Sequence, residues 1–191
     1  MIIRTYRILI SSFIVFIFAG FVNAQEINPE ITSAYTKINL DECLLLDADN
    51  MGASFACPGY KGFPLYVAEG DLRFFVSYGF GALDEIAARQ TFPAFNYIGK
   101  TLEWRLKQIN GNFMPFATIL RWFPSFADDE GYNDKTGQIL VVTKIEQGNT
   151  CHIAYIDTEL VANANEVARD FADNEAVNFN CEIDDIMYVP S

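Results

Sequence analysis

The chain of 191 residues contains a single histidine, His152. Histidine is the usual general acid or base near neutral pH, and a Ser–His–Asp or Cys–His arrangement requires one. His152 follows Cys151 within a strand-like stretch, so we interpret it as a packed or surface strand residue. Residues 25–191 also lack the G-x-S-x-G, H-E-x-x-H and S-x-x-K motifs and a phosphate-binding glycine loop. The sequence therefore predicts no catalytic residue, no metal site and no cofactor.

Carboxylate pairs are the remaining route to catalysis, because a glycosidase needs two carboxyl groups that flank the scissile bond. The candidates are Glu69 with Asp71, Glu103, and the acidic run at 128–130. An acidic chain offers many such pairs, and their spacing does not choose among them. A cell-envelope hydrolase of the glycosidase type is accordingly the alternative function.

Two acidic loops, at 47–52 and 128–134, resemble the opening of a calcium-binding loop. Neither has the bidentate glutamate that completes an EF-hand at its twelfth position, since Pro58 occupies that position after Asp47. We interpret both as solvated turns.

The first 24 residues have the organisation of a signal peptide. Arg4 and Arg7 precede an apolar stretch at 8–21, and Val22-Asn23-Ala24 offers a cleavage site. The competing interpretation, an uncleaved membrane anchor, needs roughly 20 apolar residues. Cleavage after Ala24 would leave 25–191 as a single domain in the periplasm or outside the cell, with no further membrane insertion.

The exported part is strongly acidic. The signal segment contains two arginines and no acid, so its removal takes the formal charge from −12 to −14. Such a surface repels nucleic acids and anionic lipids at long range, whereas a basic protein partner in the periplasm is compatible with it. The oligomeric state is left open.

Four cysteines, Cys43, Cys57, Cys151 and Cys181, lie in this exported part. An even number in an oxidising compartment indicates two disulfides, for which three connectivities exist. We favour Cys43–Cys57 and Cys151–Cys181, because each closes a local loop between neighbouring elements. The spacings do not suit a C-x-x-C redox motif or a zinc site.

Arginines and aromatic residues supply a candidate binding patch. Several of its charged members lie on predicted strands between large apolar residues, where they form either a structural charge network or a recognition surface. The consecutive Phe74 and Phe75 point to opposite faces of a strand, so one aromatic face is either core or a groove beside 79–99. The proposed patch consists of Tyr60, Arg73, Glu103, Arg105, Arg121 and Trp122.

The apolar pattern has mostly period two and predicts an α+β fold built on an antiparallel meander. A short helix is expected after Asp84, and a C-terminal helix capped by Asn163 or Asn165 should pack an apolar stripe, Ala164 to Ala172, on the sheet. The tail at 182–191 is expected to be loosely held. Strands are predicted at 38–46, 54–57, 65–68, 72–78, 101–107, 116–123, 139–145 and 150–156, and the last four form the meander.

Several segments together resemble an uncharacterised family of exported, periplasmic bacterial proteins with no assigned activity. These are Tyr35-Thr36, Leu40-Asp41 with Cys43, CPGYKG at 57–62, EGDLR at 69–73, EWR at 103–105, ILRWF at 119–123 and GNTCHIAY at 148–155. The resemblance covers nearly the whole exported part but carries no functional residue with it. A likeness to small disulfide-bearing periplasmic lysozyme inhibitors is one of class only. The leading expectation is an exported binding or interaction module, with inhibition of a partner protein as one way in which it could act.

Overall fold

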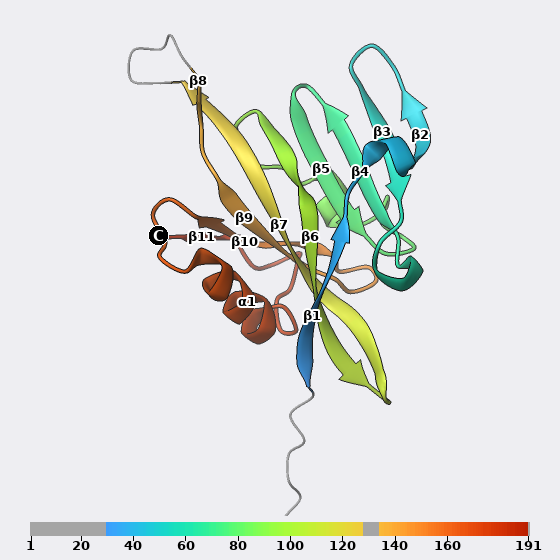
Figure 1. The fold of residues 1–191 in the computed structure, drawn as a ribbon, viewed down its shortest axis with the longest axis vertical. Coiled ribbons are helices and arrows are strands. Elements are labelled where there is room, and N and C mark those ends of the chain that lie inside the picture. The colour runs from blue at the N-terminus through green and yellow to red at the C-terminus, as the bar shows by residue number, and fades with distance from the viewer. Residues whose placement is uncertain (1–29, 128–133, 191) are drawn as a thin grey trace, which may run out of the picture.

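The computed structural model describes residues 30–127 and 134–190. The predicted signal peptide and the acidic run at 128–130 lie outside these ranges. The described part forms a larger and a smaller β-sheet, one α-helix and short 3-10 turns (Figure 1). The predicted α+β class, with a mainly antiparallel sheet and two disulfides, is confirmed.

The larger sheet contains the predicted meander. Its strands are β1 (Ile31–Lys37), β6 (Asn96–Ile109), β7 (Asn112–Ala127), β9 (Ile139–Lys144), β10 (Cys151–Asp157) and β11 (Met187–Val189), in that spatial order, with the short β8 (Asp134–Thr136) beside β7. Asn110 and Gly111 both have positive φ, of 50° and 79°, and join β6 to β7 in a two-residue turn. That conformation suits the right-handed twist of a hairpin, which explains the Asn-Gly pair.

The smaller sheet consists of four antiparallel strands, β2 (Leu44–Ala48), β3 (Gly52–Cys57), β4 (Leu65–Gly70) and β5 (Arg73–Tyr78). The continuous strand predicted at 38–46 is wrong. The chain leaves the larger sheet after β1, passes through the 3-10 turn η1 (Leu40–Glu42) and enters the smaller sheet at β2. A period of two does not reveal such a change of sheet, and β1 itself was not predicted.

The tail at 182–191, expected to be loosely held, contains β11, which pairs in parallel with β10. The Cys151–Cys181 disulfide attaches the preceding segment to the start of β10 and so brings the tail beside that strand. This expectation was therefore wrong, because the crosslink offsets part of the chain entropy that would favour a free tail.

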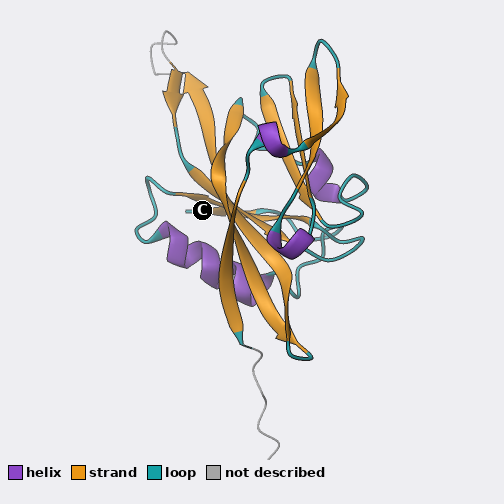
Figure 2. Ribbon diagram, turned by 45° about the vertical axis from the view of Figure 1, so that its right-hand side comes forward, coloured by secondary structure: helices purple, strands orange, loops and turns teal. Residues whose placement is uncertain are grey.

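Helix α1 and the smaller sheet lie on opposite sides of the larger sheet (Figures 1 and 2), and each side has its own hydrophobic core. On one face, α1 (Ala164–Glu175) packs the predicted stripe of Ala164, Ala168 and Ala172 against the sheet. On the other face lie the smaller sheet and the fully buried Trp104 and Trp122. Successive residues of β6 and β7 alternate between these two cores, so each strand serves both faces.

The short helix predicted near residue 84 is the 3-10 turn η3 (Ile86–Arg89). Glu85, rather than Asp84, occupies its N-cap position and makes no side-chain cap bond. The Glu85 carboxylate instead accepts hydrogen bonds from the backbone N–H groups of Gly148 and Thr150, at 2.7 and 3.0 Å. Asn163 likewise precedes α1 without a side-chain cap bond.

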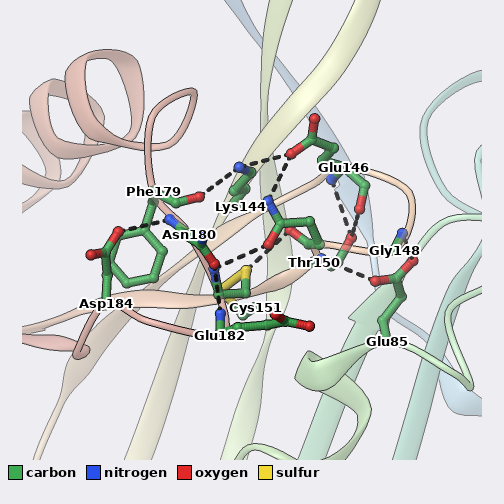
Figure 3. A network of polar contacts seen from close by, with 12 residues as sticks. Glu85, Lys144, Glu146, Gly148, Thr150, Cys151, Phe179, Asn180, Glu182 and Asp184 are labelled. Carbon is green, nitrogen blue, oxygen red and sulfur yellow. Dashed lines mark hydrogen bonds and ion pairs between the residues drawn. A yellow bond between two sulfur atoms is a disulfide. The ribbon is translucent and has the colours of Figure 1, made fainter.

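Both favoured disulfides, Cys43–Cys57 and Cys151–Cys181, are formed, as fits an extracytoplasmic protein. A polar network surrounds the second one (Figure 3). In it the buried Lys144 ammonium donates to the Phe179 carbonyl at 2.7 Å and pairs with Glu146 at 2.8 Å. The network thus joins the end of β9 to the segment that carries Cys181.

Within the described ranges, none of the helices has the length and apolar character needed to cross a membrane.

Candidate functional site

The structure brings together three of the six residues of the candidate patch. Glu103 and Arg105 on β6 and Arg121 on β7 all bond to side chains of α1. Trp122, adjacent to Arg121, points to the opposite core and is 1% exposed. Tyr60 lies in the 3-10 turn η2 (Tyr60–Gly62), away from these three residues.

Arg73 belongs to β5 of the smaller sheet, where it pairs with Asp71 and lies 5.0 Å from the ring centroid of Phe95. The six residues therefore do not form one surface.

The three grouped residues lie in or beside a groove between α1 and the larger sheet, which we call the α1 groove. Its volume is about 430 Å³. Ile119 and Leu140 are its buried apolar members, whereas most of the other side chains are aromatic, polar or charged. The full lining consists of Tyr35, Gly99, Lys100, Thr101, Glu103, Ile119, Arg121, Phe123, Leu140, Asn165 and Arg169.

An irregularity of β6 shapes this groove. Ile98 pairs with Trp122 and Leu102 pairs with Leu120, so residues 99–101 of β6 lie opposite Arg121 alone. Such a bulge bends its strand and redirects side chains locally. A Cβ atom on Gly99 would lie 3.0 Å from the Arg121 carbonyl oxygen, so this close approach favours glycine. The bulge places Lys100 and Thr101 on the groove wall.

Among the described residues, the hydrogen-bond partners of the Arg121 side chain are all neutral. Its guanidinium donates to Gln138 Oε1 at 3.1 Å, Thr158 Oγ1 at 3.2 Å and Asn165 Oδ1 at 3.3 Å. In the part of the chain that the structure describes, Arg121 forms no ion pair with a carboxylate. The guanidinium has N–H donors beyond these three, and its planar fork matches the oxygens of a carboxylate or phosphate. Its charge is fixed in place but not neutralised.

A charge network lies beside Arg121. Glu103 accepts hydrogen bonds from Ser33 at 2.6 Å and from Arg169 at 2.7 and 3.2 Å. Arg105 makes a two-pronged contact with Asp173 and also donates to Ser33. Burial alone would raise the pKa of Glu103, but the hydrogen bonds from Arg169 and Ser33 and the charges of Arg169 and Arg105 lower it. Glu103 is thus held as a carboxylate.

The charged groups that line the groove are three cations, Lys100, Arg121 and Arg169, and one anion, Glu103. Arg105 and Asp173 form a neutral pair next to them. A locally cationic groove in a chain with a formal charge of −12 is therefore a distinct electrostatic feature. Lining walls of low dielectric constant strengthen the field of such a group of charges.

The lowered pKa of Glu103 predicts a specific dependence of stability on pH. A carboxylate whose pKa is lower in the folded than in the unfolded chain stabilises the fold above its ordinary pKa of about 4.5 and loses that contribution as pH falls. The Glu103→Gln variant lacks the contribution at all pH values. We expect the difference in unfolding free energy between wild type and variant, measured in urea, to shrink below about pH 4.5. A difference independent of pH would contradict the assignment.

Of the other candidate carboxylates, Glu69 and Asp71 do not line the groove, and the run at 128–130 lies outside the described residues. Glu69 is on β4 and Asp71 follows that strand, both in the smaller sheet. Residues 30–127 and 134–190 contain no group of three or more His, Cys, Asp or Glu side chains that could hold a metal ion. In the turn at 47–52, Asp49 accepts hydrogen bonds from the amides of Met51 and Gly52, as expected of a solvated turn.

His152 is buried, in agreement with its interpretation as a packed strand residue. Burial lowers its pKa to about 3, so the ring is neutral at pH 7. Its Nδ1 lies 2.8 Å from the Tyr155 hydroxyl, and its ring meets that of Trp122 edge to face. The ring lies outside the lining of the α1 groove.

Sequence reasoning missed the partners of the groove on β1 and α1. Asn165, Arg169 and Asp173 are spaced four residues apart, and each directly follows one alanine of the apolar stripe of α1 in the sequence. That spacing is the signal that could have found them, because residues four apart share one helix face. Ser33 and Tyr35 had no such signal, since β1 itself was not predicted.

Comparison of the chain with protein-family models, with curated proteins and with solved structures finds no match. The function is therefore argued from the geometry and chemistry of the described residues.

Proposed function

We propose that the protein is an exported, periplasmic binding module that holds the anionic group of a small ligand at Arg121 in the α1 groove. The observation that carries this proposal is a guanidinium that is held by Gln138, Thr158 and Asn165 and forms no ion pair within residues 30–127 and 134–190. Neutral acceptors orient the fork without neutralising it. A ligand carboxylate or phosphate would supply the missing negative charge.

The composition of the groove supports a ligand with an apolar part beside its anionic group. Ile119 and Leu140 provide apolar surface, and the aromatic rings of Tyr35 and Phe123 flank the cations. Binding sites for small molecules typically combine such apolar walls with a few fixed polar groups. A volume of about 430 Å³ is sufficient for a small organic acid.

Two features support an extracytoplasmic location. Both disulfides link neighbouring elements of the fold, and disulfides persist in oxidising compartments. The N-terminal segment has the charge and hydropathy pattern of a signal peptide, which favours export to the periplasm.

Binding fits the groove better than glycoside hydrolysis. Hydrolysis of this type requires a carboxylic acid with a raised pKa and a second carboxylate. The groove has one carboxylate, Glu103, whose pKa is lowered and whose oxygens are occupied by Arg169 and Ser33. A carboxylate that is ionised and accepts hydrogen bonds at both oxygens is poorly suited to donate a proton.

An NMR titration with phenylacetate and with inorganic phosphate tests the proposal and distinguishes the two anion classes. We expect at least one of them to shift the amides of residues 99–101. The Arg121→Gln variant should weaken that binding about tenfold to a hundredfold, since hydrogen bonds to charged groups contribute about 1.5–3 kcal/mol. Higher salt should weaken binding to the wild type as well.

The matched control is Arg89→Gln, which removes an exposed arginine in η3 outside the groove and should leave the affinity unchanged. Phenylacetamide, the neutral counterpart of phenylacetate, should bind more weakly than the acid. Equal binding of acid and amide, undiminished binding to Arg121→Gln, or no shift with either anion at millimolar concentration would each refute the proposal.

A further inference from the structure

A second cavity, of about 210 Å³, lies where the larger sheet meets the smaller one, away from α1. One side of it is aromatic, with Phe63, Tyr78 and Phe80. The other side contains Glu85 and Glu146, which flank the turn between β9 and β10. We call this cavity the Phe80 pocket. None of its lining residues belongs to the α1 groove.

Phe80 is the most exposed large apolar side chain described, at 88%. Its ring meets Phe63 edge to face at 5.9 Å between centroids, and Phe63 meets the buried Trp104 in the same way at 5.9 Å. The Phe80 ring therefore lies at the rim of the pocket and is largely exposed to solvent. Exposed aromatic residues beside a pocket are typical of protein interaction sites.

The opposite wall is acidic (Figure 3). The buried Glu85 carboxylate is fixed by the amides of Gly148 and Thr150, while the Glu146 side chain is 57% exposed. The buried Lys144, which does not line the pocket, pairs with Glu146 at 2.8 Å, and the Asn149 side-chain amide donates to the same carboxylate at 2.9 Å. Glu146 is thus paired with a cation from outside the lining, and the lining residues themselves include two carboxylates and no lysine or arginine.

Both walls are held by disulfides. Cys57 begins the loop that carries Phe63 and is bonded to Cys43. Cys151 directly follows Thr150 on the acidic side and is bonded to Cys181. Within the first loop, a Cβ atom on Gly59 would lie 2.6 Å from the Trp104 ring, so the loop packs tightly against the core. A preformed pocket of this kind avoids part of the ordering cost of binding.

We infer that the Phe80 pocket accepts an arginine side chain of a protein partner. A guanidinium can stack on aromatic rings and form hydrogen bonds with carboxylates at the same time. The acidic wall and the formal charge of −12 complement a basic partner surface. This occupant is a cation, whereas the ligand proposed for the α1 groove is an anion. The two sites also share no lining residue, so each can be tested without the other.

An NMR titration with the peptide acetyl-Gly-Arg-Gly-amide tests this inference. Its matched probe contains citrulline, which keeps the shape of arginine but carries no charge. We expect the arginine peptide to shift the amides of Phe80 and Gln147 and to bind at least about fivefold more tightly than the citrulline peptide. Phe80→Ala should weaken arginine binding about fivefold and Glu146→Gln about threefold.

The control variant is Leu83→Ala, which removes another exposed side chain, 57% accessible, that does not line the pocket. It should bind as the wild type does, and so should Arg121→Gln, which separates this site from the α1 groove. Unchanged amide spectra elsewhere would show that Phe80→Ala remains folded. Equal affinity for both peptides, preference for an uncharged norleucine peptide, or shifts confined to other surfaces would overturn the inference.

Discussion

Replacing Arg105 by methionine is expected to lower the free energy of unfolding by about 3–5 kcal/mol, the usual cost of removing one member of a buried ion pair. The Arg105 side chain is 9% exposed and bonds Asp173 with two N–H groups. Its removal leaves the Asp173 carboxylate, 22% exposed, without that partner. The Ser33 hydroxyl oxygen also loses the N–H group that donates to it. Urea unfolding of wild type and variant measures the loss.

A second substitution separates the lost attraction from the cost of an unpaired charge. In the double variant Arg105→Met with Asp173→Leu, both charges are absent, so we expect a loss at least about 1 kcal/mol smaller than in the single variant. Lys37→Met serves as the control, because Lys37 is an exposed cation on β1 outside the network. A single variant as stable as this control would show that the network does not hold α1 on the sheet.

The elements that the sequence predicted are those set by local chemistry. The strand at 101–107 and the apolar stripe of α1 each depend on neighbouring residues, and each is found in the structure. The disulfide pairing was predictable for a related reason, since each bond closes a short loop. Cys43 and Cys57 lie at the two ends of the β2–β3 hairpin, whereas the segment between Cys151 and Cys181 contains α1.

The candidate site was only half predictable because it depends on non-local pairing. Alternation places Glu103 and Arg105 on one face of β6, but it does not say that α1 covers this face. Arg121 shares that face because Glu103 pairs with Ile119 and Arg121 lies two residues further along β7, a register that the sequence alone does not give. Including Trp122 in the predicted patch was wrong for a simpler reason. Trp122 is the neighbour of Arg121 on one strand, and neighbouring strand residues face opposite sides.

The two inferred sites are built differently around the larger sheet. Alternate residues of the long strands β6 and β7 serve its two cores, and on the α1 face these strands supply Glu103, Arg105 and Arg121. The α1 face gathers cations around Arg121. The other face adds the turn between β9 and β10, whose conformation depends on Glu85 and on the Cys151–Cys181 disulfide.

Removing the Cys151–Cys181 disulfide, by replacing both residues with alanine, is expected to lower the free energy of unfolding by about 3.5 kcal/mol. The bond spans 30 residues, and on the chain-entropy model a loop of this length restricts the unfolded chain slightly more than the 14 residues between Cys43 and Cys57, for which about 3 kcal/mol is expected. Urea unfolding of the two double variants gives both losses.

Hydrogen exchange distinguishes a local anchor from a general crosslink, because each disulfide attaches a different element. Without Cys151–Cys181, the amides of β11 should lose protection first, since this bond joins the segment before β11 to the start of β10. Without Cys43–Cys57, the amides of β2 and β3 should lose protection while β11 keeps it, because that bond lies in the smaller sheet. If both variants lose protection uniformly, the tail is held by the strand pairing and polar contacts of the whole fold, and the disulfide only restricts the unfolded chain.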